Sequence, residues 1–395
     1  MKKKMNILIK KSVLCFLMLF MLSGCLGGRE INDLEIVIGM GVDKDENTEN
    51  ILVTAQIVKV GEIEKTSGSS GGGPENKAFW NVSHTGNSIF EAVRQITHKT
   101  GNRLFVSHNQ AVIFGKDIAL EDVQKYIDFF LRAHEMRPTA LILIAENRAS
   151  DVMDAKPETE ILPAMNIAKL VKAYGFTSHF YKVNVKDFAS CIMSATSAPI
   201  APIVGISKDN GSKDIYVSGM AVFKNAKMVG ELNQLETRGL LWVLGEVKSG
   251  VILVPSPNRQ GNAVLEILKT RSKVTPEINN GKIVMNIKIK MESSLSEQTT
   301  TENLATIPAF EEIQKALEEI IRQEIMTAFD KSRELNADIF GFGEILHKKY
   351  NNVWKTIKDD WDEVYPTIKL NIEVEARIQK TDLLKKPATS NKKGK

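Results

Sequence analysis

The stretch KIVMNIKIKM at residues 282–291 decides the fold class of this chain, because apolar and polar side chains alternate along it. The apolar side chains that share one face of the stretch are Ile283, Met285, Ile287 and Ile289. The polar side chains of the opposite face are Lys282, Asn286, Lys288 and Lys290. A period of two predicts a strand with one buried face and one face in water.

Further strands and a long helix surround this stretch. The pattern of apolar residues predicts a hairpin turning at Asn225, a helix over 234–244, strands over 251–254, 263–274 and 367–378, and a long helix over 306–335. The alternation of strands and helices predicts an α+β fold rather than a helix bundle. We expect largely antiparallel or mixed sheets and a long late helix.

The first half of the chain alternates strands with helices. Strands are predicted over 35–42, 51–60, 79–83, 109–114 and 140–145, and helices over 89–100 and 120–131. Ser88 and Glu91 form a capping-box pattern at the first helix, and Gly101 ends it. Residues 156–202 are patchier and mostly helical in pattern.

Composition divides the chain into four parts. We expect a leader over 1–24, an N-terminal α/β region over 25–205, a C-terminal α+β domain over 212–379, and a basic tail over 380–395. The N-terminal region is expected to form one or two sub-domains and contains TSGSSGGGP at 66–74, which predicts a flexible exposed loop. The lysine-rich tail is expected to be disordered, and a weak contact with anionic lipid stays open as an alternative.

The leader has the composition of a secretory signal. Five lysines precede a short apolar run, which ends in Leu22-Ser23-Gly24-Cys25. An apolar run of about ten residues is too short for a hydrocarbon core that needs roughly 20. A buried core helix is also disfavoured, by the lysines before the run and the glycines after it. The ending resembles a lipobox, so we expect cleavage between Gly24 and Cys25, with N-palmitoyl and S-diacylglycerol groups on Cys25.

Motifs of catalysis or cofactor binding are not recognised in the sequence. Residues 39–41 lack the third glycine of a dinucleotide-binding loop. Residues 43–54 begin like a calcium loop, but Thr48 and Thr54 stand where glycine and glutamate are needed. Cys191 is the single cysteine after Cys25, so we expect no disulfide. We predict no enzyme, no cofactor, no metal site and no nucleic-acid partner.

Two groups of residues are more distinctive than an ordinary core or surface. Arg132, Glu135 and Arg137 follow a helix and precede a strand, where ion pairing or capping is the simpler interpretation. The second group, which follows the long helix, comprises Asp338, Phe342, Glu344, Trp354 and Trp361. Its aromatic residues could anchor either the core or an interface. We retain both groups as partner-contact or structural residues.

Four ordered stretches carry a resemblance to a known family. They are Cys25 with 29–34 and 38–43, GNSIFEAVR at 86–94, LFVSH at 104–108 onward to 114–115, and DIFGFGE at 338–344 with Trp354 and Trp361. In this order they resemble the C-subunit lipoproteins of spore nutrient-germinant receptors, the Ger(x)C family. The lysine-rich end after Gln379 is a departure and leaves the role of the tail open.

The resemblance implies a non-enzymatic palmitate-bearing lipoprotein on the outer face of the spore inner membrane of a Gram-positive spore former. It implies a role in receptor assembly or signal transmission, with two integral-membrane subunits as partners, one transporter-like and one a second multi-spanning protein. The alternative function is a solute-binding lipoprotein that delivers a small nutrient to a transporter. That alternative predicts two similar doubly wound lobes joined by hinge strands.

Overall fold

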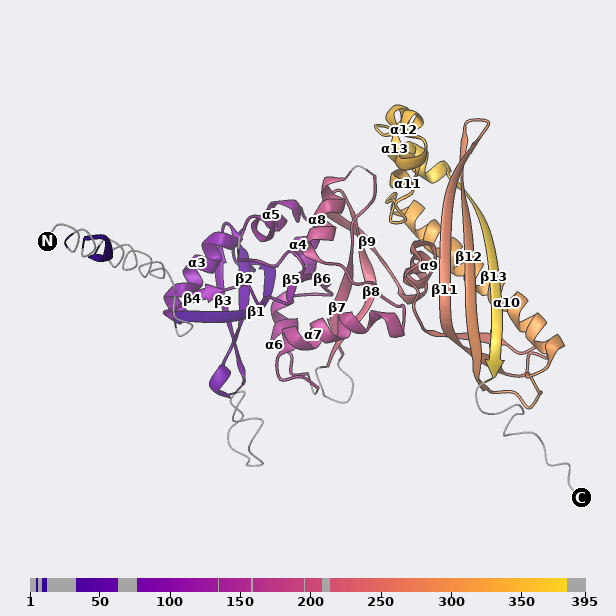
Figure 1. Ribbon diagram of the computed structural model, residues 1–395, viewed down its shortest axis with the longest axis horizontal. Helices are drawn as coiled ribbons and strands as arrows, with labels where there is room; N and C mark the ends of the chain where they lie inside the picture. The colour runs from indigo at the N-terminus through magenta and orange to yellow at the C-terminus, as the bar shows by residue number, and fades with distance from the viewer. Residues whose placement is uncertain are drawn as a thin grey trace, which may run out of the picture.

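The computed structural model describes residues 5, 9–12, 33–62, 77–133, 135–157, 159–194, 196–207 and 214–381. The expected leader cleavage site, Cys25, the loop at 66–74 and the tail from residue 382 lie outside these residues. Within the described parts of the chain, no helix is long and apolar enough to cross a membrane. Figure 1 shows an elongated molecule with two sheets, which occupy its two halves.

The first sheet has nine strands, in the order β3-β2-β1-β5-β6-β7-β8-β9, with β4 beside β1. Its strands are β1 (Leu34–Lys44), β2 (Ile51–Val58), β3 (Phe79–Gly86), β4 (Arg103–Phe105), β5 (Ala111–Phe114), β6 (Leu141–Ala145), β7 (Ile200–Ile206), β8 (Ile215–Lys224) and β9 (Lys227–Leu232). Strands β1, β5, β6 and β7 are parallel, and antiparallel hairpins flank them on both sides. Five of these strands, β5 to β9, lie side by side in the order in which they follow along the chain.

Helices cover both faces of the first sheet (Figure 1). The helices on one face are α3 (Ile89–Thr100), α4 (Lys116–Ala119), α5 (Gln124–Arg132) and α8 (Val185–Met193), and their buried side chains join the larger core. The helices α6 (Ala149–Asp154) and α7 (Pro163–Lys172), followed by the short η2 (Ala173–Phe176), build a second core.

The glycines of the Gly39-Met40-Gly41 segment let the second helix layer approach β1 closely. A Cβ at Gly39 would lie 2.6 Å from the Cβ of Ala164, and one at Gly41 would lie 2.7 Å from the Sδ of Met153. Both contacts are too short for any side chain, so α6 and α7 can pack directly on the backbone of β1. The two glycines therefore have a structural role, which is to allow close packing of these helices on β1.

The single helix predicted over 120–131 is wrong in its first turn. The chain forms α4 and α5 instead, with a turn between them. The amide of Val123 donates to the carbonyl of Ala226 at 3.0 Å, and the amide of Gln124 donates to the side chain of Asp122 at 2.9 Å. These bonds divert the backbone from the helical pattern.

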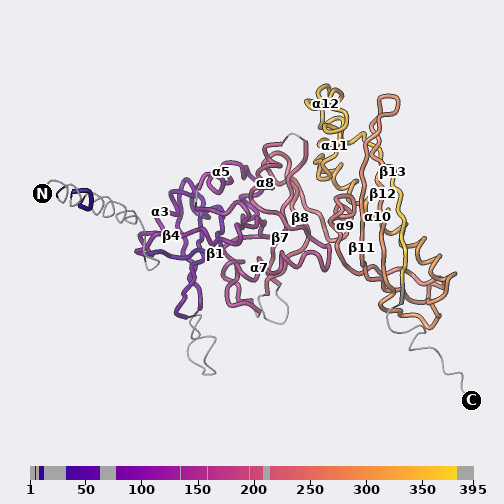
Figure 2. Tube along the Cα trace, in the orientation of Figure 1, coloured from indigo at the N-terminus to yellow at the C-terminus, as the bar shows by residue number. Residues whose placement is uncertain are grey.

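The second sheet has four strands, β10 (Val251–Pro255), β11 (Asn262–Asn279), β12 (Lys282–Gln298) and β13 (Lys369–Thr381), in sequential order. Strand β13 runs parallel to β12, while the other pairs are antiparallel. The side chains of β12 that were predicted to face the core are buried; they are Ile283, Met285, Ile287 and Ile289. The long helix α10 (Ile307–Glu334) crosses the inner face with α9 (Gln234–Leu244), as the tube in Figure 2 shows. The predicted α+β class with mixed sheets is confirmed.

The hairpin between β7 and β8 bears on the expected domain boundary. We expected the N-terminal region to end at residue 205 and the C-terminal domain to begin at 212. The two strands on either side of this boundary pair within the first sheet, for example Gly205 with Tyr216. The proposed domain bounds stay a prediction, and this pairing places residues 215–232 with the first sheet.

Candidate functional site

The turn after α10 is organised by the buried carboxylate of Asp338. This carboxylate accepts hydrogen bonds from the amides of Phe342 at 3.0 Å and Gly343 at 2.7 Å, at the start of α11 (Phe342–Lys349). Burial raises the pKa of Asp338 to about 7, against the opposing effect of these amides. Gly341 supplies the left-handed backbone that the turn requires, with φ of 66°.

This turn docks on the segment that precedes β7 of the first sheet. The amide of Ala198 donates to the carbonyl of Asp338 at 2.8 Å, and the amide of Glu344 donates to the carbonyl of Thr196 at 3.2 Å. The hydroxyl of Thr196 donates in turn to the Glu344 carboxylate at 2.9 Å. Lys348 and Thr196 lower the pKa of Glu344. We call this contact the junction; it joins residues 196–198 to residues 338–344.

Close packing reinforces the junction. A Cβ on Gly343 would lie 2.8 Å from the Thr196 carbonyl oxygen and 2.9 Å from the Trp354 ring. An ion pair of 2.9 Å between Lys224 of β8 and Asp362 of α13 (Trp361–Val364) adds a second link between the two halves. The DIFGFGE stretch therefore holds the halves of the molecule together.

The predicted aromatic residues of the C-terminal half lie in one buried cluster. Each ring of the cluster contacts the next in the order Phe329, Phe340, Phe342, Tyr365, Trp361 and Trp354. Phe340 and Phe342 stack at 5.1 Å between ring centroids, and Trp354 of α12 (Asn351–Ile357) meets Trp361 at the same distance. Their burial places them in the core that supports the junction, and a role in partner contact stays a prediction.

Trp361 and Tyr365 complete the surroundings of Asp338. The indole of Trp361 lies close enough to lower the pKa of Asp338, although its Nε1 makes no hydrogen bond of normal geometry. The hydroxyl of Tyr365, in η4 (Tyr365–Thr367), lies 2.7 Å from the hydroxyl of Ser332. Burial raises the pKa of Tyr365 well above its ordinary value. Asp338 is thus enclosed by aromatic rings, which explains why desolvation dominates its pKa.

Arg132 and Glu135 lie at a separate place, in a groove between α3 and α5. Arg132 pairs with Asp128 one turn earlier at 2.7 Å, and Glu135 pairs with Arg103 of β4 at 2.6 Å. Arg137 is exposed and does not line the groove. The three residues predicted as one group are therefore divided between the groove and the open surface.

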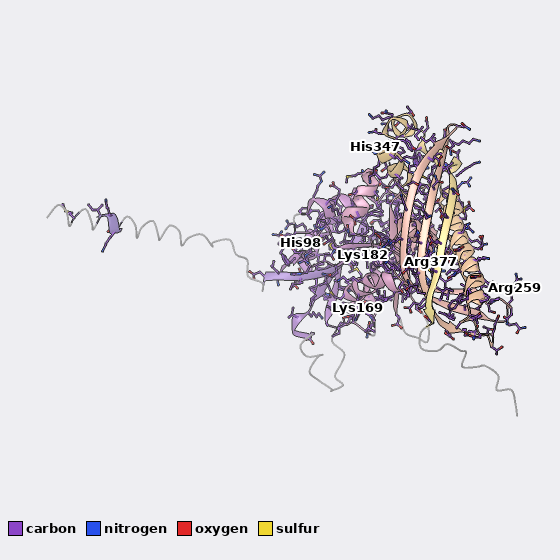
Figure 3. All side chains as sticks on the ribbon, turned by 45° about the vertical axis from the view of Figure 1, so that its right-hand side comes forward. His98, Lys169, Lys182, Arg259, His347 and Arg377 are labelled. Atoms are coloured by element: carbon purple, nitrogen blue, oxygen red, sulfur yellow. The ribbon has the colours of Figure 1, made fainter. Side chains whose placement is uncertain are left out.

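Figure 3 labels His98 near the end of α3, far from Arg377 of the second sheet.

A buried ion pair between α9 and α10 was missed by sequence reasoning. Arg238 donates through Nε and Nη2 to both carboxylate oxygens of Glu324, and the indole of Trp242 donates to the same carboxylate at 2.8 Å. Gly239 permits this approach, since a Cβ there would lie 2.1 Å from the Glu324 carbonyl oxygen. The available signal was the position of Glu324 three residues after Ile321, on the apolar stripe of α10.

Asp43, which occupies the first position of the calcium-like spacing in the sequence, lies in strand β1 and caps the start of a distant helix. Its carboxylate accepts from the amides of Ala149 at 2.7 Å and Ser150 at 2.9 Å, at the first turn of α6. Burial raises the pKa of this carboxyl despite those bonds. In the described residues, no group of three or more His, Cys, Asp or Glu side chains is placed to hold a metal ion.

Two family descriptions match the chain in succession. Residues 27–206 match the family described as spore germination protein N-terminal domain. Residues 218–382 match the family described as spore germination B3/GerAC like, C-terminal. The two matches leave between them only the connection from β7 to β8 and the first residues of β8.

Curated proteins and one solved structure resemble the chain along most of its length. The putative spore germination protein YfkR of Bacillus subtilis (strain 168) is 26% identical over 382 residues, covering 96% of this chain and 98% of the relative. Spore germination protein KC of the same organism is 26% identical, with the same coverage. The crystal structure of the GerBC protein superposes with a TM-score of 0.57 at 18% identity, covering 86% of this chain and 97% of that one. This last similarity concerns the fold.

Proposed function

Since this chain belongs to the Ger(x)C family of spore-germination C subunits, we propose that it is a membrane-anchored subunit of a nutrient-germinant receptor. The observation that carries this proposal is the succession of the two family matches, which run in order over residues 27–206 and 218–382. A protein that borrowed only one of the two parts would not match in this way.

The proposed role is receptor assembly and signal transmission. The junction gives this role a physical basis, because it couples the segment before β7 to the turn after α10 through hydrogen bonds and close packing. A displacement of one half would therefore be passed to the other. This coupling suits a subunit that relays a conformational change between partners.

The proposed anchor is Cys25, cleaved from Gly24 and carrying N-palmitoyl and S-diacylglycerol groups. Confinement to a bilayer raises the effective concentration of the protein near membrane partners. A single acyl chain binds a membrane weakly, whereas two or more chains bind it stably. We place the protein on the outer face of the spore inner membrane, beside a transporter-like subunit and a second multi-spanning subunit.

We propose a non-catalytic protein, and the support for this is its family, which is not a known enzyme family. The alternative solute-binding function predicts two similar doubly wound lobes. The two halves differ instead, with a nine-stranded sheet in one and a four-stranded sheet under a long helix in the other. The fold therefore favours the receptor subunit.

Deletion of the gene for this chain, in the spore-forming organism that carries it, tests the proposed function. We expect germination with the receptor's nutrient to be lost and germination with a non-nutrient trigger to be kept. Normal germination with every nutrient tested would contradict the proposal. Strong thermal stabilisation of the isolated protein by an amino acid or sugar, without any germination defect, would favour the solute-binding alternative.

A further inference from the structure

Helix α3 presents a second face that the described elements cover only in part. Its core face consists of Ile89, Ala92 and Ile96, which are buried. The neighbouring face consists of Phe90, Val93, Arg94 and Thr97, which line a groove toward α5. The spacing of three, four and seven residues is that of a helix face that packs against another helix. Phe90 is nevertheless 56% exposed.

The groove continues along α5 as two adjoining pockets. They have volumes of ≈ 320 Å³ and ≈ 520 Å³, and both are lined by Phe90, Phe129 and Arg132. The rings of Phe90 and Phe129 lie 6.4 Å apart between the two helices. We call this feature the α3–α5 groove. An apolar trough between two helices, with large aromatic side chains at its centre, is a shape that accepts a third helix.

Charges at the rim add a second requirement on the occupant. Arg103 and Glu135 satisfy each other, and Arg132 is paired with Asp128. The guanidinium of Arg94 lies 5.0 Å from the centre of the Phe90 ring. Among the residues that the structure describes, Arg94 has no acidic partner. An acidic side chain on the occupant would complement it.

The position of the groove places it near the proposed membrane anchor. Leu34 opens β1 and pairs with Arg103 of β4, a residue of the groove wall. Eight residues lie between Cys25 and Leu34, so the nine Cα-to-Cα steps of a fully extended chain span at most ~30 Å. If Cys25 lies in the bilayer, the groove lies within reach of segments at the membrane surface.

We propose that the α3–α5 groove binds an amphipathic helix of an integral-membrane receptor subunit at the membrane surface. Apolar side chains of that helix fill the two pockets beside Phe90, and an acidic side chain pairs with Arg94. A flat bilayer would leave the two recessed pockets unfilled, which is why the occupant is a helix. This inference rests on the proposed receptor function and names the partner surface for it.

Site-specific crosslinking in spores tests the occupant. A photoreactive amino acid replaces Phe90 in the full-length lipidated chain, and the control replaces Phe176, which is 77% exposed on η2. We expect the Phe90 position to form an adduct that mass spectrometry maps to an amphipathic helix of an integral-membrane receptor subunit. We expect no such adduct from the control. Adducts solely with lipid, adducts with a second copy of this chain, or no adduct would overturn the proposal.

Charge variants separate this inference from the proposed function. Phe90→Glu and Arg94→Glu are each expected to lower the recovery of membrane subunits with the chain by about tenfold, the loss typical of a central interface residue. Phe176→Glu is expected to leave recovery unchanged. All three variants should unfold at the wild-type temperature, because the replaced side chains lie at the surface.

The outcomes of these variants are distinct. If wild type and Phe90→Glu recover the membrane subunits equally, the groove is not their binding site, and the receptor function stands. If wild type recovers no membrane subunit, the receptor function and the groove proposal both fail.

Discussion

The hydroxyl of Thr196 donates a hydrogen bond of 2.9 Å to the carboxylate of Glu344, although the two residues are 148 positions apart in the chain. Thr196 precedes β7 of the first sheet, and Glu344 lies in the first turn of α11. With the backbone bond between the same residues, this contact forms the centre of the junction.

The coupling between these two residues is expected to be measurable. In a double-mutant cycle, Thr196→Val and Glu344→Ala should show a coupling energy of about 0.5–1.5 kcal/mol in the free energy of unfolding. The lower part of that range is expected, since the Glu344 side chain is 41% exposed and water screens it. Urea unfolding gives the free energy of unfolding of the wild type, the two single variants and the double variant. As a control, Thr356→Val, whose hydroxyl bonds only locally to Val353, should be additive with Glu344→Ala. If the effects of Thr196→Val and Glu344→Ala on the free energy of unfolding simply add, the hydrogen bond between these residues does not stabilise the fold.

The carboxyl of Asp338 should make stability depend on pH. The ordinary pKa of an aspartate, which applies to the unfolded chain, is 3.8, and the pKa of Asp338 in the folded protein is about 7. Between these values the folded protein holds a proton that the unfolded chain has released, so stability is present below about pH 4 and is lost as pH rises through 7. Each pKa unit corresponds to about 1.4 kcal/mol, which gives a change of a few kcal/mol at most.

Comparison with Asp338→Asn isolates this effect, because the other titrating groups cancel in the difference. The unfolding free energy of wild type minus that of the variant should fall between about pH 4 and pH 7. Unfolding in urea across this range measures it. A difference that stays constant with pH would rule out the raised pKa.

Removal of one partner of the buried Arg238–Glu324 pair should destabilise the protein strongly. Glu324→Leu leaves the Arg238 guanidinium buried without its acceptor, and such changes cost about 3–5 kcal/mol. The double variant Arg238→Met with Glu324→Leu should recover part of that loss, because no charge remains buried. Glu311→Gln, on the exposed side of α10, is the control and should be neutral. Equal urea midpoints for wild type and Glu324→Leu would contradict a stabilising role for the pair.

Cys25→Ala tests the proposed anchor without altering the described fold. We expect the variant to lose labelled fatty acid, to be released from spore membranes and to slow nutrient-triggered germination. The isolated protein should unfold at the wild-type temperature. Fatty acid label that remains on the variant would refute Cys25 as the lipid-bearing residue.

Local patterns in the sequence predicted many elements correctly. The alternation in β12 and the Ser88 cap of α3, whose hydroxyl accepts from the amide of Glu91, were readable because each depends on neighbours within a few residues. The Glu91 side chain bonds the amide of Asn87 rather than that of Ser88, so the predicted capping box is only half formed. The apolar stripe of α10 was readable for the same reason. The break between α4 and α5 was not, since it depends on Ala226, about a hundred residues away.

The candidate site was less readable, because its contacts join distant segments. The DIFGFGE stretch was distinctive in the sequence, whereas its partner at Thr196 has no distinctive sequence signal. The calcium-like spacing at Asp43 was rejected as a metal site from the sequence, but its contact with the first turn of α6 could not be read from the sequence. Residue type and spacing indicated which side chains were unusual, and only the packing shows what each of them contacts.

The most direct test of a receptor subunit is crosslinking of this chain in intact spore membranes, followed by recovery of the chain and identification of the proteins attached to it. We predict recovery together with the transporter-like and the second multi-spanning integral-membrane subunits of a germinant receptor. Recovery of the chain without either integral-membrane subunit would contradict the proposed function.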